Sequence, residues 1–340
     1  MSRMTTINDI AKATGVAKST VSNVFSGKKF VSSEIREKVL ATAEKMEYSP
    51  NFYARVLSHK NESNILGLFL ENNEADGGFQ PYYDTLIRSL TIEAAKHGFS
   101  LLIYFGLSNQ DMACNLKPGR SPIDAAILVS PSTGDERLSK ISSSLIPFVV
   151  IGNPKGLFGG KEGNSIDTDN VGLVRRIFLE MKRQGCKKIT MINSNQTLTI
   201  TQDRDEGFNE AANSDKIAKG EIFYSAHSTK EDGYYYASRA LKDGADAIIC
   251  ANGFIASGAY EAIGDAGLKV GTDVKVFSLG YSHSNDLSFA PSLSYAAQDY
   301  AEFARQAVDL IVDDIANKSA PKSVIISSKI HYNDSFVEPK

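Results

Sequence analysis

The stretch GVAKSTVSNVF, at residues 15–25, gathers side chains that hydrogen bond well with nucleic acids. Lysine, serine, threonine and asparagine reach phosphate oxygens and base edges, although the last three are mediocre helix formers. Val21, Val24 and Phe25 recur at helical spacing, which predicts a short helix with one apolar face. The side chains left on its outside are Lys18, Ser19, Ser22 and Asn23.

Two more short helices are predicted around this one. The first starts at Thr6, with Asp9 three residues later as in a capping box, and it stops at Gly15. The third starts at Ser32. Two helices joined by a tight turn and followed by a supporting helix are typical of a helix-turn-helix, whose second helix fits the major groove. A three-helix bundle with a solvated polar face has the same spacing.

The charge of the chain is unevenly distributed. Residues 1–60 contain ten Lys and Arg against five Asp and Glu, a net charge of +5. The whole chain carries −3, so the other 280 residues carry −8. A basic head on an acidic body indicates an anionic partner at the head.

The stretch YSPNFYARVLSHK, at residues 48–60, predicts a fourth short helix, from Pro50 to about Leu57, with Ser49 as its cap. Eight residues are too few for a stable isolated helix in water. We therefore expect this segment to fold when a partner offsets its ordering entropy, the alternative being an ordinary linker helix.

The blocks IAKATGVAKSTVSNV, VSSEIREKV and YSPNFYARVL, in this order, resemble the N-terminus of the lactose/galactose repressor (LacI/GalR) family. The resemblance implies a sequence-specific transcriptional regulator, and within that class a repressor, whose second helix lies in the major groove. It also implies a hinge helix in the minor groove, with Leu57 as an apolar wedge between base steps. The implied DNA contacts are Thr6, Ala17, Lys18, Ser19, Thr20, Ser22, Asn23, Asn51, Ala54, Arg55 and Leu57.

Beyond residue 60, apolar and β-branched runs alternate with helical stretches, which predicts βαβ units, parallel sheets and two lobes. Open sheets of this kind bind ligands at the carboxyl ends of their strands. Strands are predicted at 65–70, 100–105, 125–129, 148–151, 188–192, 221–224, 246–251, 274–279 and 323–328. Helices are predicted at about 81–97, 170–184, 203–213, 231–242, 254–266 and 299–317.

The resemblance continues through this body, in SIDTDNVGLV, DRDEGFNEA and PSLSYAAQD, which look like the family's regulatory domain. It implies an all-α helix-turn-helix head and an α/β two-lobed body like that of periplasmic binding proteins. The implied domains are a DNA-binding domain at 1–48, a hinge helix and linker at 49–60, and an effector-binding and dimerisation domain at 61–340. Within the last, the N-subdomain would take about 61–162 and 295–320, and the C-subdomain about 163–293 and 321–340.

An effector cleft between the lobes is also implied by the resemblance, lined by Tyr82, Tyr83, Arg204, Asn252, Ser282 and Gln298. The tyrosines would stack on a ring, and Arg204 would hold hydroxyls, a carboxylate or a phosphate. The alternative is that the tyrosines pack the lobes together and the arginine pairs locally.

Three positions depart from the family pattern. Gly152, Gly253 and Ser282 stand where family members frequently have aspartate. A cleft that keeps Arg204 and loses these acids tolerates an anion better. We therefore expect a phosphorylated or acidic metabolite, within a broader expectation of a sugar or phosphorylated sugar.

Other classes of protein are less well supported. The sequence has no G-x-S-x-G or H-E-x-x-H motif, and its five histidines lack metal-ligand spacing, so no catalytic residue, metal or cofactor is predicted. The two alternatives are a solute-binding protein and a sugar-modifying enzyme with an accessory head. No signal-peptide run and no stretch of about 18 apolar residues is found, so we expect no membrane partner and a cytoplasmic, nucleoid-associated protein.

The expected partners follow from these features. They are a pseudo-palindromic double-stranded DNA operator, a small-molecule effector and a second copy of the chain. No apolar heptad follows the last predicted strand. We therefore expect a homodimer and not a zipper-linked tetramer.

Overall fold

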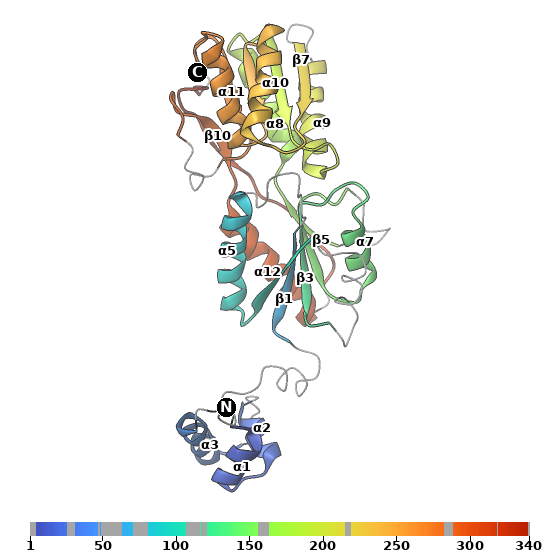
Figure 1. Ribbon diagram of the computed structural model, residues 1–340. Coiled ribbons are helices and arrows are strands. Elements are labelled where there is room, and N and C mark those ends of the chain that lie inside the picture. Colours follow the sequence, from blue (N-terminus) through green and yellow to red (C-terminus); the bar gives the residue numbers. More distant parts are fainter. Residues whose placement is uncertain are drawn as a thin grey trace. The chain divides into compact units, whose positions relative to one another are not determined.

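The computed structural model divides the chain into two compact units, a head at Met1–Ser63 and a body at Asn64–Lys340 (Figure 1). The structure describes residues 5–25, 31–46, 48, 63–70, 81–106, 116, 121–155, 163–214, 219–281, 288–317 and 319–338. The predicted hinge helix, with Asn51, Ala54, Arg55 and Leu57, lies outside the described residues, as does Ser282.

The head contains the three predicted helices, α1 (Ile7–Thr14), α2 (Lys18–Phe25) and α3 (Ser33–Lys45). At the start of α1 the Asp9 carboxylate accepts hydrogen bonds from the Thr6 backbone N–H at 2.9 Å and from its hydroxyl at 2.6 Å. Gly15 ends α1 with φ +69°, a conformation that glycine adopts at little cost. The Ser32 hydroxyl caps α3. The three helices pack on a small apolar core formed by Ile10, Val21, Val24, Val39 and Ala43.

The N-lobe of the body is built on a six-stranded sheet in which every neighbouring pair is parallel. In spatial order its strands are β11 (Ser323–Ile325), β5 (Asn164–Asp167), β4 (Phe148–Ile151), β3 (Ala125–Val129), β1 (Ile65–Leu70) and β2 (Ser100–Phe105). Its helices are α5 (Pro81–Lys96), α7 (Glu136–Ser143) and α12 (Tyr300–Asn317). Figure 1 shows α5 and α12 on one face of the sheet and α7 on the other. Because both faces are covered, the central strands are continuous apolar runs.

The C-lobe repeats this architecture with a second six-stranded sheet. Its strands in order are β12 (Lys329–His331), β10 (Ser294–Ala297), β9 (Lys275–Ser278), β8 (Ala247–Cys250), β6 (Lys188–Asn193) and β7 (Lys219–Tyr224). All neighbouring pairs are parallel except β10 and β12. The helices are α8 (Asn170–Arg183), α9 (Thr199–Asn213), α10 (Lys230–Lys242) and α11 (Gly253–Asp265), with α8 and α9 on one face and α10 and α11 on the other.

The chain passes between the lobes three times. Residues 168–169 lead from β5 to α8, residues 298–299 from β10 to α12, and residues 326–328 from β11 to β12. The side-chain amide of Gln298 donates to the Thr168 hydroxyl at 3.4 Å, which joins two of these crossovers. The lobes are therefore connected by three short segments about which they can change their mutual angle.

The crossovers correct the predicted subdomain boundaries by a few residues. β5 and β11 were expected in the C-subdomain but pair in the N-lobe sheet, and β10 starts in the C-lobe although its residues from 295 were expected in the N-subdomain. The strand predicted at 323–328 ends at Ile325 because the next three residues cross to the other lobe. Sheet membership depends on backbone pairing between distant segments, which local composition does not encode.

Four short elements have no counterpart among the predicted ones, namely α7, β5, β10 and β12. The three strands have the sequences NSID, SYAA and KIH, in which small or polar residues hide the usual apolar pattern. In the described part of the chain, no helix combines the length and apolar content that a membrane crossing requires.

Candidate functional site

The first candidate site is the outer surface of α2 in the head. The backbone carbonyl of Ala17 accepts from the N–H groups of Thr20 and Val21, so the helix starts directly after Ala17. Ala17, Lys18 and Ser19 are exposed at this N-terminal end, whereas Thr20, Ser22 and Asn23 are half-buried. Thr6 is exposed at the start of α1. The free N–H groups and positive dipole of a helix N-terminus, next to Lys18, favour contact with phosphates and with base acceptors.

The second candidate site is a cavity of about 190 Å³ between the two lobes of the body. Part of its wall is made of residues that directly follow strands of both sheets, as expected for the carboxyl ends of parallel strands. These residues are Ser130 after β3, Gly152 after β4, Ser194 after β6, Ala251 after β8 and Leu279 after β9.

The N-lobe side of the cavity is aromatic. The hydroxyl groups of Tyr82 and Ser130 are hydrogen bonded at 2.6 Å, and burial raises the pKa of Tyr82. Tyr83 is buried in the N-lobe core with its ring 4.3 Å from that of Tyr82. Tyr300 lies at the start of α12, its ring 6.4 Å from that of Tyr82. The two predicted tyrosines therefore pack the lobe and line the cavity at once.

Arg204, on α9, reaches the cavity from the C-lobe. Its side chain is buried, and its Nε has no hydrogen-bond partner among the described residues. Burial lowers the pKa of Arg204 to about 10, an effect that the nearby negative charge of Asp167 opposes. The guanidinium stays charged at neutral pH, so a residue of the cavity wall is a buried cation with unused donor capacity.

Asp167, at the end of β5, lines the same cavity and was missed from the sequence. Its Oδ1 accepts from the Thr168 N–H at 2.7 Å and from the Asn170 amide at 3.2 Å. Burial raises the pKa of Asp167 to about 7, while the Thr168 hydrogen bond and Arg204 act against that rise. The cavity therefore contains one carboxyl group, although the three positions that depart from the family pattern supply none.

Asn252 and Gln298 also line the cavity, and each side chain already makes hydrogen bonds to other groups of the protein. The Asn252 carbonyl oxygen accepts from the Ile255 N–H at 3.0 Å and caps α11, and its amide donates to Ser228 at 3.4 Å. Gln298 holds the crossover described above. Both residues shape the cavity wall as well as offering polar atoms to it.

Gly152 shows why aspartate is absent from that position. Its φ is +127°, a region that only glycine readily adopts. A Cβ there would lie 2.6 Å from Cδ of Pro131, which also lines the cavity. The residue after β4 therefore brings backbone, and not a carboxylate, to the cavity.

Several other wall residues were not foreseen, among them Ser130, Ser194, Phe254, Tyr281 and Tyr300. Their positions could have indicated them, because Ser130 directly follows the strand predicted at 125–129 and Ser194 lies two residues past the strand predicted at 188–192. Tyr281 lies two residues past the strand predicted at 274–279. The described residues contain no cluster of His, Cys, Asp and Glu that could hold a metal ion.

Both units match known families. Residues 6–51 match the family described as bacterial regulatory proteins, lacI family, and residues 179–336 match the periplasmic binding protein-like domain. The HTH-type transcriptional repressor PurR of Mannheimia succiniciproducens is 27% identical over 335 residues, 95% of each chain. The regulator MalR of Streptococcus pneumoniae is 26% identical over 329 residues, 94% of this chain and 95% of that one.

Solved structures show the same fold. The lac repressor dimer bound to operator and an anti-inducer superposes with a TM-score of 0.84 at 18% identity, covering 99% of this chain and all of that one. The regulator CelR in complex with cellobiose has a TM-score of 0.68 at 21% identity, covering 97% and 99%.

A helix-turn-helix head and a two-lobed body with an interlobe cavity define a DNA-binding protein with a periplasmic-binding-protein-like domain. The head of the chain matches the lacI family of bacterial regulatory proteins, and nearly the whole chain is similar to DNA-binding transcriptional regulators such as PurR and MalR.

Proposed function

We propose that the protein is a repressor that binds a pseudo-palindromic operator as a homodimer and responds to a small anionic metabolite in the interlobe cavity. The observation that carries the ligand part is Arg204, a buried cation whose Nε has no partner among the described residues. A carboxylate or phosphate satisfies such a group with charge-assisted hydrogen bonds. The aromatic N-lobe wall suits a flat or ring-shaped ligand body.

The DNA part rests on the predicted contact residues of the head. Lys18 and Ser19 are exposed at the start of α2, with Ala17 and Thr6 exposed beside the helix starts. The proposed roles are base reading by Lys18, Ser19 and Asn23 and phosphate contact by Thr20 and Ser22. Asn51, Ala54, Arg55 and Leu57 are proposed minor-groove contacts of the hinge, on the strength of the sequence pattern.

The homodimer is supported by apolar side chains on one edge of the N-lobe. β2 is an edge strand, and Leu102, Ile103 and Phe105 on it are 36–44% exposed. Ile92 on α5 is 55% exposed. An edge strand with exposed apolar side chains is typically covered by another protein surface. If that surface is a second copy of the chain, the dimer would place two heads on the two halves of a palindrome.

The repressor sense is proposed from the similarity to PurR, whose name describes a transcriptional repressor. Metabolite binding would change the angle between the lobes and so the spacing of the two hinges. Linkage then requires that operator binding change the metabolite affinity by the same factor. The cavity is compatible with a metabolite that weakens operator binding and with one that strengthens it.

Selection from a random duplex DNA library with the purified full-length protein tests the regulator proposal first. Enrichment of a pseudo-palindrome with a central pyrimidine–purine step is expected, because such a step kinks easily around an apolar wedge. If no sequence is enriched, the selection is repeated with a covalent dimer of the head. A second selection without enrichment would contradict the regulator proposal.

Calorimetric titration with matched neutral, carboxylated and phosphorylated sugars tests the ligand class separately. We expect the anions to bind and the neutral sugars to bind weakly. Tight binding of a neutral sugar, with none of its phosphate ester, would overturn the anion proposal and leave the DNA proposal standing.

A further inference from the structure

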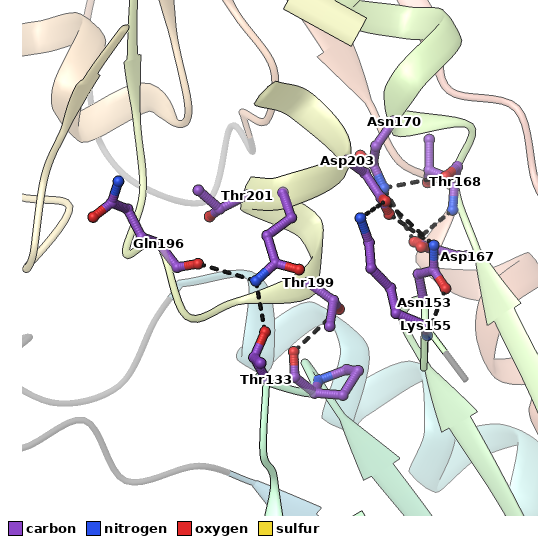
Figure 2. Close-up of polar contacts among 12 residues, drawn as sticks. Thr133, Asn153, Lys155, Asp167, Thr168, Asn170, Gln196, Thr199, Thr201 and Asp203 are labelled. Carbon is purple, nitrogen blue, oxygen red and sulfur yellow. Dashed lines mark hydrogen bonds and ion pairs between the residues drawn. The ribbon is translucent and has the colours of Figure 1, made fainter. Parts of the chain in front are cut away.

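A set of direct protein contacts closes one side of the cavity. Two N-lobe segments, residues 131–133 after β3 and residues 153–155 after β4, contact the beginning of α9 and the turn before it in the C-lobe (Figure 2). We call these contacts the clasp. We propose that the clasp holds the two lobes together in the absence of any ligand, and that Asp203 is its central residue and positions the neighbouring Arg204.

One half of the clasp is made by the backbone. Ser132 and Leu198 form an antiparallel bridge between the lobes, and the Thr133 N–H donates to the Thr197 carbonyl at 2.7 Å. The Pro131 carbonyl accepts from both the N–H and the hydroxyl of Thr199, each at 3.1 Å. These groups bond across the lobe boundary as if in a short sheet, so separating the lobes exposes several donors and acceptors at once.

The other half of the clasp is a polar cluster around Asp203. The Asn153 amide donates to the Asp203 carboxylate at 3.1 Å, and the Lys155 ammonium lies 2.8 Å from its Oδ1. The Asp203 side chain is 6% exposed and that of Lys155 is 27% exposed. Near the backbone half, the Gln202 amide donates to the Thr133 hydroxyl at 2.6 Å. Asp203 thus belongs to the C-lobe and takes its described side-chain partners from the N-lobe.

The clasp and the ligand cavity share residues. Pro131 and Thr199, which bond to each other, both line the cavity, and Arg204 follows Asp203 directly on α9. Figure 2 shows Asp203 turned toward Asn153 and Lys155, close to Asp167 at the start of the first crossover. When the clasp is formed, α9 is fixed against the N-lobe and Arg204 is held at the wall. When it is broken, that wall of the cavity opens.

The clasp acts on the lobes before a ligand binds, and its effect does not depend on which ligand the cavity takes. If the closed conformation is already populated without ligand, the binding site exists before the ligand arrives. The ligand then need not supply the full free energy of closing the lobes. For any ligand that binds the closed conformation, the apparent affinity rises in proportion to the fraction of molecules that are closed.

Double electron–electron resonance on the full-length protein, without added metabolite, tests the proposal. Spin labels are placed at Leu145 in the N-lobe, 84% exposed, and at Lys242 at the end of α10 in the C-lobe, also exposed. Cys114 is replaced by serine, while Cys186 and Cys250 are buried. Labelled chains are diluted with unlabelled ones so that only distances within one chain are measured.

The variants are K155Q, D203N and their combination, with K140Q as the matched control. Lys140 has the same 27% side-chain exposure and an ion pair within α7, to Glu136, so its loss removes one N-lobe charge without touching the clasp. We expect K155Q and D203N each to raise the ratio of open to closed distances about fivefold. The double variant should do little more than either single one, because both remove the same interaction.

The control K140Q is expected to keep the wild-type distance distribution. Unchanged distributions in K155Q and D203N, with folding verified by circular dichroism, would overturn the proposal. So would equal broadening in all four variants. Either result would leave the operator and ligand proposals untouched, because those are read from DNA enrichment and from titration.

Discussion

Two opposite charges define the interlobe cavity at the scale of single residues. Arg204 is a buried cation whose Nε lacks a partner among the described residues, and Asp167 is a buried acid with a pKa raised to about 7 by burial. Below that pH the acid is neutral and the cavity is positive. Above it the acid is ionised and competes with any anion for Arg204.

Binding of an anion is therefore expected to depend on pH in a defined direction. For a sugar acid, whose carboxylate is ionised throughout, the affinity should fall about tenfold between pH 6 and pH 8 as Asp167 loses its proton. Calorimetric titration across this range measures the effect. The variant D167N keeps a neutral amide at every pH, so its affinity for the sugar acid should not change between pH 6 and pH 8. If the affinity of D167N still falls over this range, a group other than Asp167 is titrating.

The head offers a residue-scale prediction of its own. K18A should weaken operator binding about 10- to 100-fold, since a good base contact contributes roughly 1–3 kcal/mol. K45A removes an equal charge from the last turn of α3, outside the proposed contact set, and serves as the control. Fluorescence anisotropy on the selected operator measures both. Equal losses in the two variants would mean that only the overall charge of the head matters.

At the scale of elements, the C-lobe depends on a close approach of two helices. A Cβ at Gly258 of α11 would overlap the Lys230 carbonyl oxygen at the start of α10, and one at Gly233 of α10 would overlap the Ile255 carbonyl oxygen. The two helices lie side by side on one face of the sheet (Figure 1). Their contact is made by backbone, so it has no flexible side chain that can move aside.

G258A is accordingly expected to destabilise the protein by about 2 kcal/mol, because the added methyl group must push the helices apart. Gly264 lies on the same helix, and a Cβ there would meet nothing within 4 Å. G264A should therefore be neutral or stabilise by up to about 1 kcal/mol, the usual gain of alanine over glycine in a helix. Urea denaturation of both variants decides the matter, and a loss of stability in G264A as large as in G258A would rule out the contact as its cause.

At the scale of the whole molecule, regulation requires that the lobes move and that two chains move together. The three crossovers at residues 168–169, 298–299 and 326–328 give the first property. The exposed apolar edge of the N-lobe is the surface that we propose for the second. In the proposed mechanism, ligand binding would change the angle between the lobes, and a dimer would convert that angle into a distance between two DNA-binding units.

I103E should therefore give a monomer. A charge in the centre of an apolar interface is costly to desolvate, so size-exclusion chromatography with light scattering is expected to show the mass of one chain. Operator affinity should drop by at least about a hundredfold, since each head then binds alone. L145E places the same charge on an isolated exposed leucine of the N-lobe and should remain a dimer. A dimeric I103E would place the interface elsewhere.

Local sequence determined most of the elements and the class of the molecule. Thr6, Asp9, Gly15 and Ser32 marked helix ends in the head because caps and turns depend on neighbours only a few residues away. The long βαβ alternation predicted parallel sheets because buried strands need continuous apolar runs. The family pattern then placed Tyr82, Tyr83, Arg204, Asn252 and Gln298, all of which line one cavity.

Only the tertiary structure decided which segments meet across the chain. It assigned β5, β10 and β11 to their sheets, since backbone pairing brings together strands that are up to about 160 residues apart. It brought Asp167, at a crossover, to the cavity that Arg204 enters from the other lobe, and burial there shifted both pKa values. It also joined Asn153 and Lys155 to Asp203. Such contacts cannot be predicted from spacing along the sequence, because they depend on how the lobes pack in space and not on the local preferences of the chain.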